Sequence, residues 1–311
     1  MADAIRFSDS PFSTIDRERM RRINFLVIGA QKAGTTWLHR ALKEHEDAFL
    51  PDQKEIHFFN ANANFAKGAD WYLSFFRGSE QKTAVGEVTP NYIWSHVSEF
   101  ESQFNHVVSR QVAPRVRDAL PHVKLLISLR NPVDRAISAY YHFVTRGDFS
   151  PFQRLRDCMH MKGVASMGRY DKQLESWFAV FPKDQIKVLV YEDDIRPDEA
   201  KMETVNRVYR FLGLEEKDHL PGLFDRQNAQ QAHVLAYLRQ IPGLRGPRNA
   251  VWTGRPPLGE RIALALNRRI PPRIQTLFKV RVEQADRDAL AEHYAPHQAR
   301  IENMLGRALP W

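Results

Sequence analysis

The sequence is poor in cysteine and in long apolar runs. Its 311 residues contain one cysteine, Cys158, which excludes an internal disulfide and gives no sign of an oxidising compartment. No uncharged apolar run approaches the roughly 20 residues that a membrane-crossing helix needs. Nine charged side chains within residues 1–22 leave no room for the apolar stretch of a signal peptide. We therefore expect a cytoplasmic protein without a transmembrane segment.

The composition is that of a globular protein, and its charge is unevenly distributed. With 43% hydrophobic and 26% charged residues, the chain is neither disordered nor collagen-like and can bury one sizeable core. The formal net charge is +8, and residues 226–311 carry all of it, with 14 Lys plus Arg against 6 Asp plus Glu. Such a segment attracts nucleic acid, anionic lipid or an anionic small molecule, unless its arginines are merely dispersed over the surface.

Short apolar runs alternate with helical patterns along the first 215 residues. Residues 24–28, 124–129 and 186–190 are typical of buried strands, and residues 35–45, 132–144, 171–181 and 199–212 of helices. Continuous apolar strands separated by helices predict a parallel sheet that is covered on both faces. Ligands of such sheets bind at the carboxyl ends of the strands.

Residues 29–37, between the first expected strand and the first expected helix, have the make-up of a phosphate-binding loop. Gly29 and Gly34 allow tight turns and a close approach of the backbone to an anion. The amides that open the helix at Thr35 point toward such an anion, and Lys32 supplies a mobile cation. In the ATP-binding loop the lysine directly follows the second glycine, whereas here Thr35 takes that place.

This loop resembles the phosphosulfate-binding loop of the sulfotransferases that use 3′-phosphoadenosine 5′-phosphosulfate (PAPS). In that family a strand ends in the pattern K-x-G-T-[ST], which is matched here by Lys32, Gly34, Thr35 and Thr36. The resemblance implies that PAPS binds to a continuous set of loop residues, namely Lys32, Ala33, Gly34, Thr35, Thr36 and Trp37.

The resemblance continues in residues 54–59, KEIHFF, which are similar to a segment of the heparan sulfate and related carbohydrate sulfotransferases. The glutamate of that segment is the proposed general base, so the resemblance implies this role for Glu55. A hydroxyl acceptor needs such a base because its proton must leave as the oxygen attacks sulfur. His57 corresponds to a histidine that orients the acceptor or shares in proton transfer, and which of the two is the sole base stays open. If the segment is extended, alternation places both side chains on one face.

Residues 85–92 look like the family segment E-x-[ST]-P-x-Y, with one departure. Heparan-modifying relatives often carry lysine at the position of Val88, and its absence leaves Lys32 as the main electrostatic partner of the leaving group. Glu87 is either a second carboxylate in the cleft or part of a helix cap or salt bridge.

Residues 129–140 supply the third family motif, directly after an expected strand. In the family the arginine and the serine eight residues later bind the 3′-phosphate, which implies this role for Arg130 and Ser138. A guanidinium fork at a strand end and a hydroxyl on the next helix can converge on one phosphate. Asp134 and Arg135 are expected to form an ion pair that holds the helix. Arg169 and Tyr170 are further candidates for an approach to the cofactor.

The resemblance spans about residues 23–215 and recurs weakly near the carboxyl terminus. It implies a three-layer α/β/α fold with a central parallel sheet, the P-loop-like fold of sulfotransferases. We expect one domain over residues 1–311, with a core at about 23–215 and a basic, helical C-terminal appendage or lid at about 221–311. Relatives close the adenosine pocket with a basic loop in this appendage, but the motifs do not align it with Arg226, Arg245, Arg248 or Arg255.

The expected activity is sulfuryl transfer from PAPS to a hydroxyl, or secondarily an amine, of a carbohydrate, glycolipid or small metabolite. No metal is expected, because Lys32 takes the electrostatic role that Mg²⁺ plays in kinases. Nucleic acid is not an expected partner, and the sequence does not fix the oligomeric state. Two alternatives stay open. One is a metal-dependent kinase with Asp193 and Asp194 as its metal-binding acids; the other is a noncatalytic module that binds anions or nucleic acid.

Overall fold

The centre of the protein is a parallel sheet. The structure, a computed structural model, describes residues 12–95, 111–224, 233–241, 244, 258–271 and 280–311. Within these residues the strands are β1 (Phe25–Gly29), β2 (Ala48–Phe49), β3 (Ala84–Val88), β4 (Lys124–Leu129) and β5 (Ile186–Val190). Their order across the sheet is β2-β3-β1-β4-β5, and every neighbouring pair is parallel. The chain therefore crosses from one side of β1 to the other, and ligand sites form at such a crossing point.

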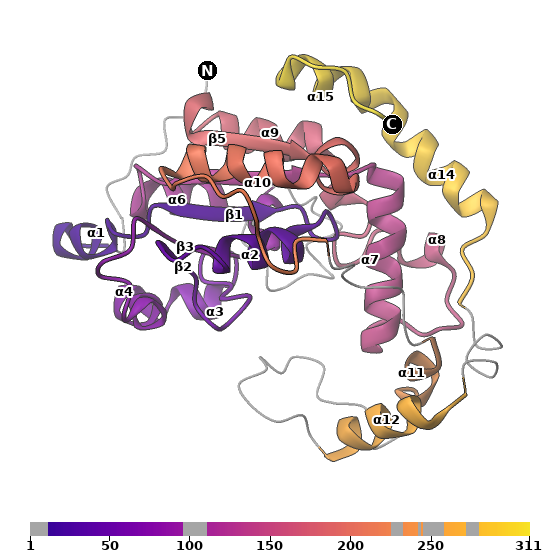
Figure 1. Cartoon of the computed structure of the whole chain (residues 1–311). Coiled ribbons are helices and arrows are strands. Elements are labelled where there is room, and N and C mark those ends of the chain that lie inside the picture. Colours follow the sequence, from indigo (N-terminus) through magenta and orange to yellow (C-terminus); the bar gives the residue numbers. More distant parts are fainter. Residues whose placement is uncertain (1–11, 96–110, 225–232, 242–243, 245–257, 272–279) are drawn as a thin grey trace.

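Helices cover both faces of this sheet, as the alternation along β1 requires (Figure 1). Phe25 and Val27 belong to one apolar cluster, which includes side chains of α2 (Thr35–Lys43) and α10 (Asp198–Leu212). Leu26 and Ile28 belong to another, with α6 (Val112–Ala119) and α9 (Tyr170–Phe178). Successive side chains of a strand point to opposite faces, so one strand feeds two apolar layers. The predicted three-layer α/β/α fold is confirmed.

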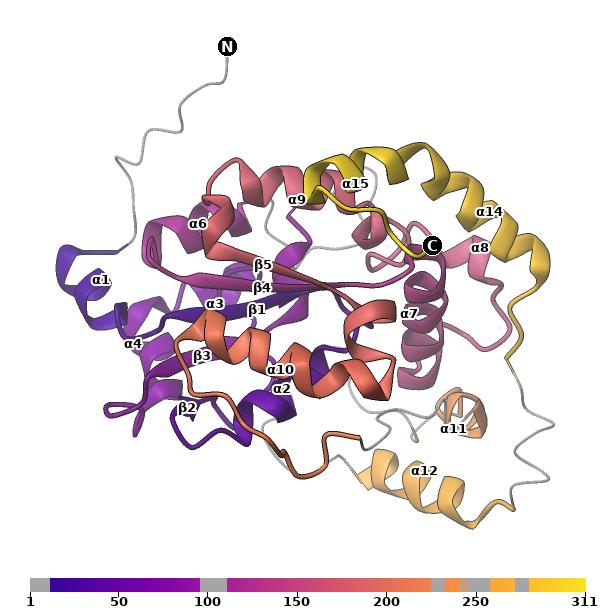
Figure 2. The same ribbon diagram turned by 45° about the horizontal axis from the view of Figure 1, so that its top comes forward.

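The remaining helices lie around this core, as Figures 1 and 2 show. They are α1 (Thr14–Met20), α3 (Asn62–Phe65), α4 (Gly68–Leu73), α7 (Pro132–Arg146), α8 (Leu155–Cys158), α11 (His233–Leu238), α12 (Leu258–Arg269), α14 (Gln284–Tyr294) and α15 (Gln298–Leu305). No helix in the described part of the chain is long and apolar enough to cross a membrane.

The last two helices pack directly on the core. The Asp286 carboxylate on α14 pairs at 3.0 Å with Arg156, which lies on α8. Arg300 on α15 pairs at 2.7 Å with Glu175 on α9, and the Tyr294 hydroxyl donates a 2.7 Å hydrogen bond to a core carbonyl. The part of the appendage beyond residue 280 is therefore tied to the sheet layers. Arg226, Arg245, Arg248 and Arg255 lie outside the described residues, and the single domain over residues 1–311 stays a prediction.

The ion pair expected between Asp134 and Arg135 is wrong. Adjacent residues on a helix point in different directions, and these two have separate partners. Arg135 is fully buried and donates hydrogen bonds to the carbonyl oxygens of Gly163 and Val164. Asp134 instead pairs with Arg287 on α14 at 3.2 Å. Both residues stabilise α7, but they do so by holding it to neighbouring segments.

The apolar pattern of the sequence does not predict strand β3, because Gly86 and Glu87 interrupt its apolar run. Gly86 lies opposite Phe25 of β1 in the register of the sheet. A Cβ at Gly86 would lie 2.2 Å from the Phe25 carbonyl oxygen and 2.7 Å from its ring. Position 86 of β3 therefore requires glycine, because the two strands pack too closely there for a side chain.

The Gly86→Ala substitution should lower the free energy of unfolding by about 3 kcal/mol, because the clash is with backbone and an enclosed ring. Urea unfolding measures this change. Gly68→Ala is the control: Gly68 has φ +77° but open space around its Cβ position, so only the backbone penalty of about 1 kcal/mol applies. Equal losses for the two variants would contradict the close approach between β1 and β3.

Candidate functional site

The loop between β1 and α2 has the shape expected of an anion-binding loop. A Cβ at Gly29 would lie 2.5 Å from Ile93 Cγ2 and 2.9 Å from the Pro90 carbonyl oxygen. Gly34 caps α2 with φ +86°, a left-handed conformation that favours glycine. The two glycines that the sequence singled out are thus required for different reasons, close packing at Gly29 and backbone conformation at Gly34.

The amino terminus of α2 offers unused donors. The amides of Thr35, Thr36 and Trp37 make no hydrogen bond with the described chain, and the first intrahelical bond runs from Leu38 to Gly34. The loop itself is fixed from β4, since Ser128 donates a 2.6 Å hydrogen bond to the Ala33 carbonyl oxygen. Free amides at a helix amino terminus bind anions through their N–H groups and the helix dipole.

Three cations and one carboxylate surround this loop. Burial and the charges of Arg130 and Lys54 lower the pKa of Lys32 below its ordinary value, whereas the charge of Glu55 acts in the opposite direction. Lys54 Nζ donates a 3.1 Å hydrogen bond to Thr36 Oγ1, and burial lowers its pKa as well. Clustered cations with one opposing charge destabilise one another, and a polyanionic ligand removes that cost.

Arg130 lies at the end of β4 and joins the loop to its surroundings. Its Nη1 donates a 3.1 Å hydrogen bond to the Lys32 carbonyl oxygen, and its guanidinium carbon lies 5.0 Å from the centre of the Tyr191 ring. Its backbone is held by Tyr170, whose hydroxyl donates a 2.9 Å bond to the Arg130 carbonyl oxygen. Arg130 Nε is buried without a partner among the described residues. Ser138 is half-buried on α7.

Arg169 and Tyr170 were the two further candidates for an approach to the cofactor. Of these, Tyr170 contacts the backbone of the site through Arg130. Arg169 does not, because its guanidinium is bidentate to Asp171 with two bonds of 3.1 Å.

Glu55 and His57 meet, although the segment that carries them is not a strand. His57 has φ 56°, so the alternation of an extended chain does not apply here. Even so, His57 Nε2 lies 3.1 Å from Glu55 Oε2, and both side chains are partly open to solvent, at 36% and 26% exposure. His57 Nδ1 lies 3.3 Å from Asn60 Oδ1, which orients the ring.

The charged form of His57 is favoured by its neighbours. Burial opposes that form, but the hydrogen bond and charge of Glu55 and the charge of Glu87 outweigh it and raise the pKa of His57. At neutral pH this pair is thus poised to hold or pass a proton.

Within the described residues, Glu87 is neither a carboxylate in an open cleft nor part of a helix cap or salt bridge. It is 2% exposed and accepts hydrogen bonds from three hydroxyls: Tyr72 at 2.9 Å, Tyr92 at 2.8 Å and Thr89 at 2.7 Å. Burial raises the pKa of Glu87 although these hydrogen bonds act in the opposite direction. The Tyr92 hydroxyl also accepts a 3.0 Å bond from the Phe58 amide, so this hydroxyl cage supports the chain beside His57.

Substituting Glu87 tests this cage. Glu87→Leu should lower the free energy of unfolding by about 3 kcal/mol, because three buried hydroxyls lose their acceptor at about 1 kcal/mol each. Glu87→Gln keeps an acceptor for both tyrosines and should cost about 1 kcal/mol. Urea unfolding of both variants measures the difference, and a loss for leucine no larger than that for glutamine would contradict the cage.

The same residue predicts a pH dependence of stability. A carboxyl whose folded pKa lies above its ordinary value of 4.5 stabilises the fold fully below that value. This contribution is lost as the pH rises through the folded pKa of Glu87. Glu87→Gln cannot titrate and should remove that part of the slope.

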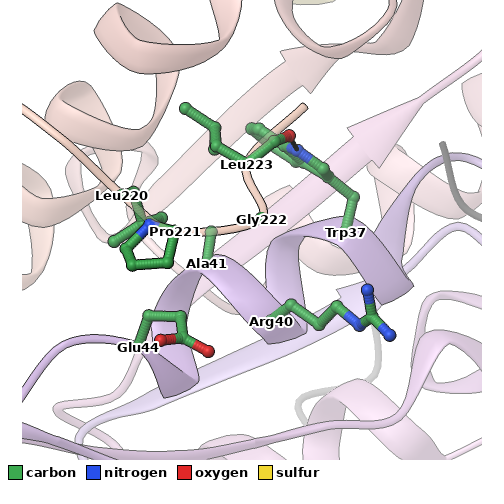
Figure 3. Close-up of a pocket in the computed structure, with 8 residues that line it drawn as sticks. All are labelled: Trp37, Arg40, Ala41, Glu44, Leu220, Pro221, Gly222 and Leu223. Atoms are coloured by element: carbon green, nitrogen blue, oxygen red, sulfur yellow. Dashed lines mark hydrogen bonds between the residues drawn. The ribbon is translucent and has the colours of Figure 1, made fainter. Parts of the chain in front are cut away.

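A pocket of about 340 Å³ lies next to the loop, between α2 and residues 220–223 (Figure 3). Its lining on the helix side is Trp37, Arg40, Ala41 and Glu44. Trp37 closes one end, where its indole Nε1 donates a 2.9 Å hydrogen bond to the Leu223 carbonyl oxygen. Trp37 thus connects the phosphate-type loop to an adjacent space whose lining also includes the charged side chains of Arg40 and Glu44.

Two residues to which the motifs assign no role, Lys54 and His142, also lie near the cations of the site. The signal for Lys54 was its position beside Glu55, and the signal for His142 was its place one helical turn after Ser138 on α7. Burial, followed by the charges of Lys32 and Arg146, lowers the pKa of His142 to about 3. His142 is therefore a neutral ring close to the cation cluster.

The acids proposed for a kinase have other partners. Asp194 is buried, pairs with Arg207 and accepts a hydrogen bond from the Val190 amide at 2.6 Å. Asp193 pairs with Arg307. Both oxygens of Asp194 and Oδ2 of Asp193 are therefore engaged by protein groups.

Comparison with known proteins agrees with the motifs. The model of the sulfotransferase domain family matches residues 22–234. A bifunctional heparan sulfate N-deacetylase/N-sulfotransferase of Drosophila melanogaster is 31% identical over 212 residues, covering 61% of this chain and 20% of that protein. The membrane-associated sulfotransferase kil1 of Dictyostelium discoideum is 35% identical over 121 residues, covering 38% of this chain and 22% of that protein. The matches thus span about a fifth of the length of these curated relatives.

A solved structure agrees over most of the chain. The crystal structure of a sulfotransferase from Alicyclobacillus acidocaldarius superposes with a TM-score of 0.58 and 25% identity, covering 92% of this chain and 96% of that one. The family model covers more than half of the chain and includes the loop, Glu55, His57 and Arg130. The chain belongs to the sulfotransferase family, as its motifs predicted.

Proposed function

We propose that this protein transfers a sulfuryl group from PAPS to a hydroxyl of a carbohydrate, glycolipid or small metabolite. The observation that carries the proposal is the cluster of Lys32, Lys54 and Arg130 around unused helix amides, electrostatically coupled to a carboxylate, Glu55. Such a cluster suits a donor with several negative charges, and the carboxylate suits the removal of a proton from an acceptor.

The residues present fit PAPS. Bound there, PAPS supplies the activated sulfuryl group. Lys32 and the amides of residues 35–37 would hold the 5′-phosphate side, where negative charge grows during transfer. Arg130 and Ser138 would hold the 3′-phosphate, a role supported by the buried and unpartnered Nε of Arg130. The pocket between Trp37 and residues 220–223 would take the nucleoside.

On the acceptor side, Glu55 takes the proton of the attacking hydroxyl in our proposal. His57 donates to the Glu55 carboxylate and orients it, since its own charged form is favoured there. Asn60 and the hydroxyl cage around Glu87 keep His57 in place. The Drosophila relative is named for N-sulfation of heparan sulfate, so an amine of a carbohydrate is the second acceptor class that we propose.

The donor is tested by comparing thermal shifts in adenosine 3′,5′-bisphosphate and in Mg²⁺-ATP. The bisphosphate should stabilise the protein more, because only it carries a 3′-phosphate for Arg130. Incubation with isotope-labelled PAPS and an extract of the source cells, followed by mass analysis, should then identify what gains a sulfate. A preference for Mg²⁺-ATP, or binding of neither nucleotide, would overturn the proposal.

A cytoplasmic location is also part of the proposal. It is supported by the single cysteine, Cys158, which is buried and free.

A further inference from the structure

Helix α12 presents apolar side chains to solvent. Leu258, Ile262 and Leu266, here called the α12 stripe, are 69%, 42% and 40% exposed. Their spacing of four residues places them on one side of the helix. Scattered single exposed leucines are common on protein surfaces, whereas an aligned apolar stripe marks a contact surface.

The stripe is not the side by which α12 joins the protein. Ala263 is fully buried and lies about 100° around the helix from Ile262, so the buried side of α12 borders the stripe at Leu266 but does not coincide with it. Helix α11 lies between α7 and α12 in both views of the fold (Figures 1 and 2). Arg239, directly after α11, donates a hydrogen bond to the Thr145 carbonyl oxygen at the end of α7. The pair α11–α12 is thus attached through α11, and the α12 stripe is left free.

The chain around the stripe is strongly cationic. Residues 226–281 contain 11 Lys plus Arg and a single acidic residue, Glu260. On α12 itself, Arg261 and Arg269 are exposed and form no ion pair with any described residue. An apolar stripe flanked by free arginines has the charge and polarity of a helix that lies in a membrane interface.

We propose that α12 docks on an anionic lipid surface, with the α12 stripe inserted among the upper acyl chains and Arg261 and Arg269 at the headgroup phosphates. A soluble polyanion would satisfy the arginines but would leave the three apolar side chains in water. A lipid surface satisfies both, and the cytoplasmic leaflet supplies the negative potential. The proposal does not depend on which group the protein sulfates.

Vesicle binding of the full-length protein tests the proposal. It should sediment with vesicles of phosphatidylcholine and phosphatidylglycerol in a ratio of about 7:3 but not with phosphatidylcholine alone, and binding should weaken as salt rises. The double variant Ile262→Gln/Leu266→Gln should bind at least about tenfold more weakly, because two apolar side chains no longer enter the lipid. Arg261→Gln and Arg269→Gln should each weaken binding about fivefold.

Ile15→Gln is the matched control. Ile15 on α1 is also an exposed aliphatic side chain, at 71%, but has no place in the stripe, so its removal should leave binding unchanged. Circular dichroism and thermal unfolding establish that each variant is folded.

A labelled variant reports insertion directly. In Ile262→Cys the new thiol is exposed, whereas Cys158 is buried and burial raises the pKa of its thiol to about 11, so a maleimide dye reacts at position 262. An environment-sensitive dye there should shift to the blue with anionic vesicles and not with dextran sulfate. Unchanged vesicle binding by a folded Ile262→Gln/Leu266→Gln variant would overturn the proposal. So would equal binding to both vesicle types, or binding to dextran sulfate with no binding to vesicles.

Discussion

Replacing Lys32 with alanine should lower kcat by about 10³-fold. Lys32 is the cation placed by the loop itself, two residues before Gly34, which caps α2. Val88 takes the place at which heparan-modifying relatives often carry a second lysine, so less charge is available to replace it. Removing one preorganised group that stabilises developing negative charge commonly costs about 10² to 10³ in rate.

Single-turnover kinetics with PAPS measure this loss in the chemical step. Lys32→Arg should recover part of the rate, and an added small alkylammonium ion should partly rescue Lys32→Ala, which a purely structural defect would not allow. Lys82→Ala is the control, since Lys82 is exposed and far from the loop in the fold. A Lys32→Ala enzyme that keeps more than about a tenth of the wild-type kcat would contradict the role of Lys32.

Replacing Glu55 with glutamine should lower kcat by about 10² to 10⁴-fold while binding of adenosine 3′,5′-bisphosphate changes little. Glutamine keeps the size of the side chain but cannot take the acceptor's proton, and general base catalysis contributes about this factor. Glu80→Gln is the control, because Glu80 is an exposed carboxylate on another segment.

The same variant carries a second readout. The hydrogen bond and charge of Glu55 raise the pKa of His57 against the effect of burial. In Glu55→Gln the charge is gone and the neutral amide oxygen is a weaker acceptor, while the effect of burial remains, so the pKa of His57 should fall, which NMR titration of the histidine ring measures. Sulfation at near wild-type rates by Glu55→Gln would refute its role as base. An unchanged pKa of His57 would contradict the contact between the two side chains.

Local patterns were sufficient for much of the fold. The residues of β4 and β5 carry uninterrupted apolar runs, and their predicted bounds coincide with the observed strands. Helix α7 begins at Pro132 as expected, because proline suits the first helical turn and the Asn131 side chain caps it. The loop between β1 and α2 could also be predicted from its residue types, although only Gly34 is required by local backbone conformation and Gly29 is required by packing against Ile93 and Pro90.

Interactions between residues far apart in the sequence could not be predicted from local patterns. The cage of Glu87 needs Tyr72, 15 residues earlier, and only the folded chain brings that hydroxyl to the carboxylate. Arg135 stands next to an acidic residue, Asp134, but its hydrogen-bond partners lie at residues 163 and 164. In both cases a buried polar group found its partner across the fold, and the sequence around it carries no periodic signal of that partner.

The contact between Glu55 and His57 is an intermediate case, because the contact was predicted correctly but from the wrong backbone conformation. The two-residue spacing suggested a shared face on an extended chain, yet His57 has a left-handed backbone and the side chains meet across a bend. The residue types were informative and the predicted backbone was wrong, because a two-residue spacing is compatible with more than one local conformation.

The central claim is that Lys32, the amides opening α2 and Arg130 together hold a doubly phosphorylated adenosine. A crystal structure of the complex with adenosine 3′,5′-bisphosphate tests it most directly. We predict the 5′-phosphate within hydrogen-bond distance of Lys32 Nζ and the amides of residues 35–37, and the 3′-phosphate at Arg130 and Ser138. A nucleotide bound elsewhere, or bound here in the opposite orientation, would contradict the account.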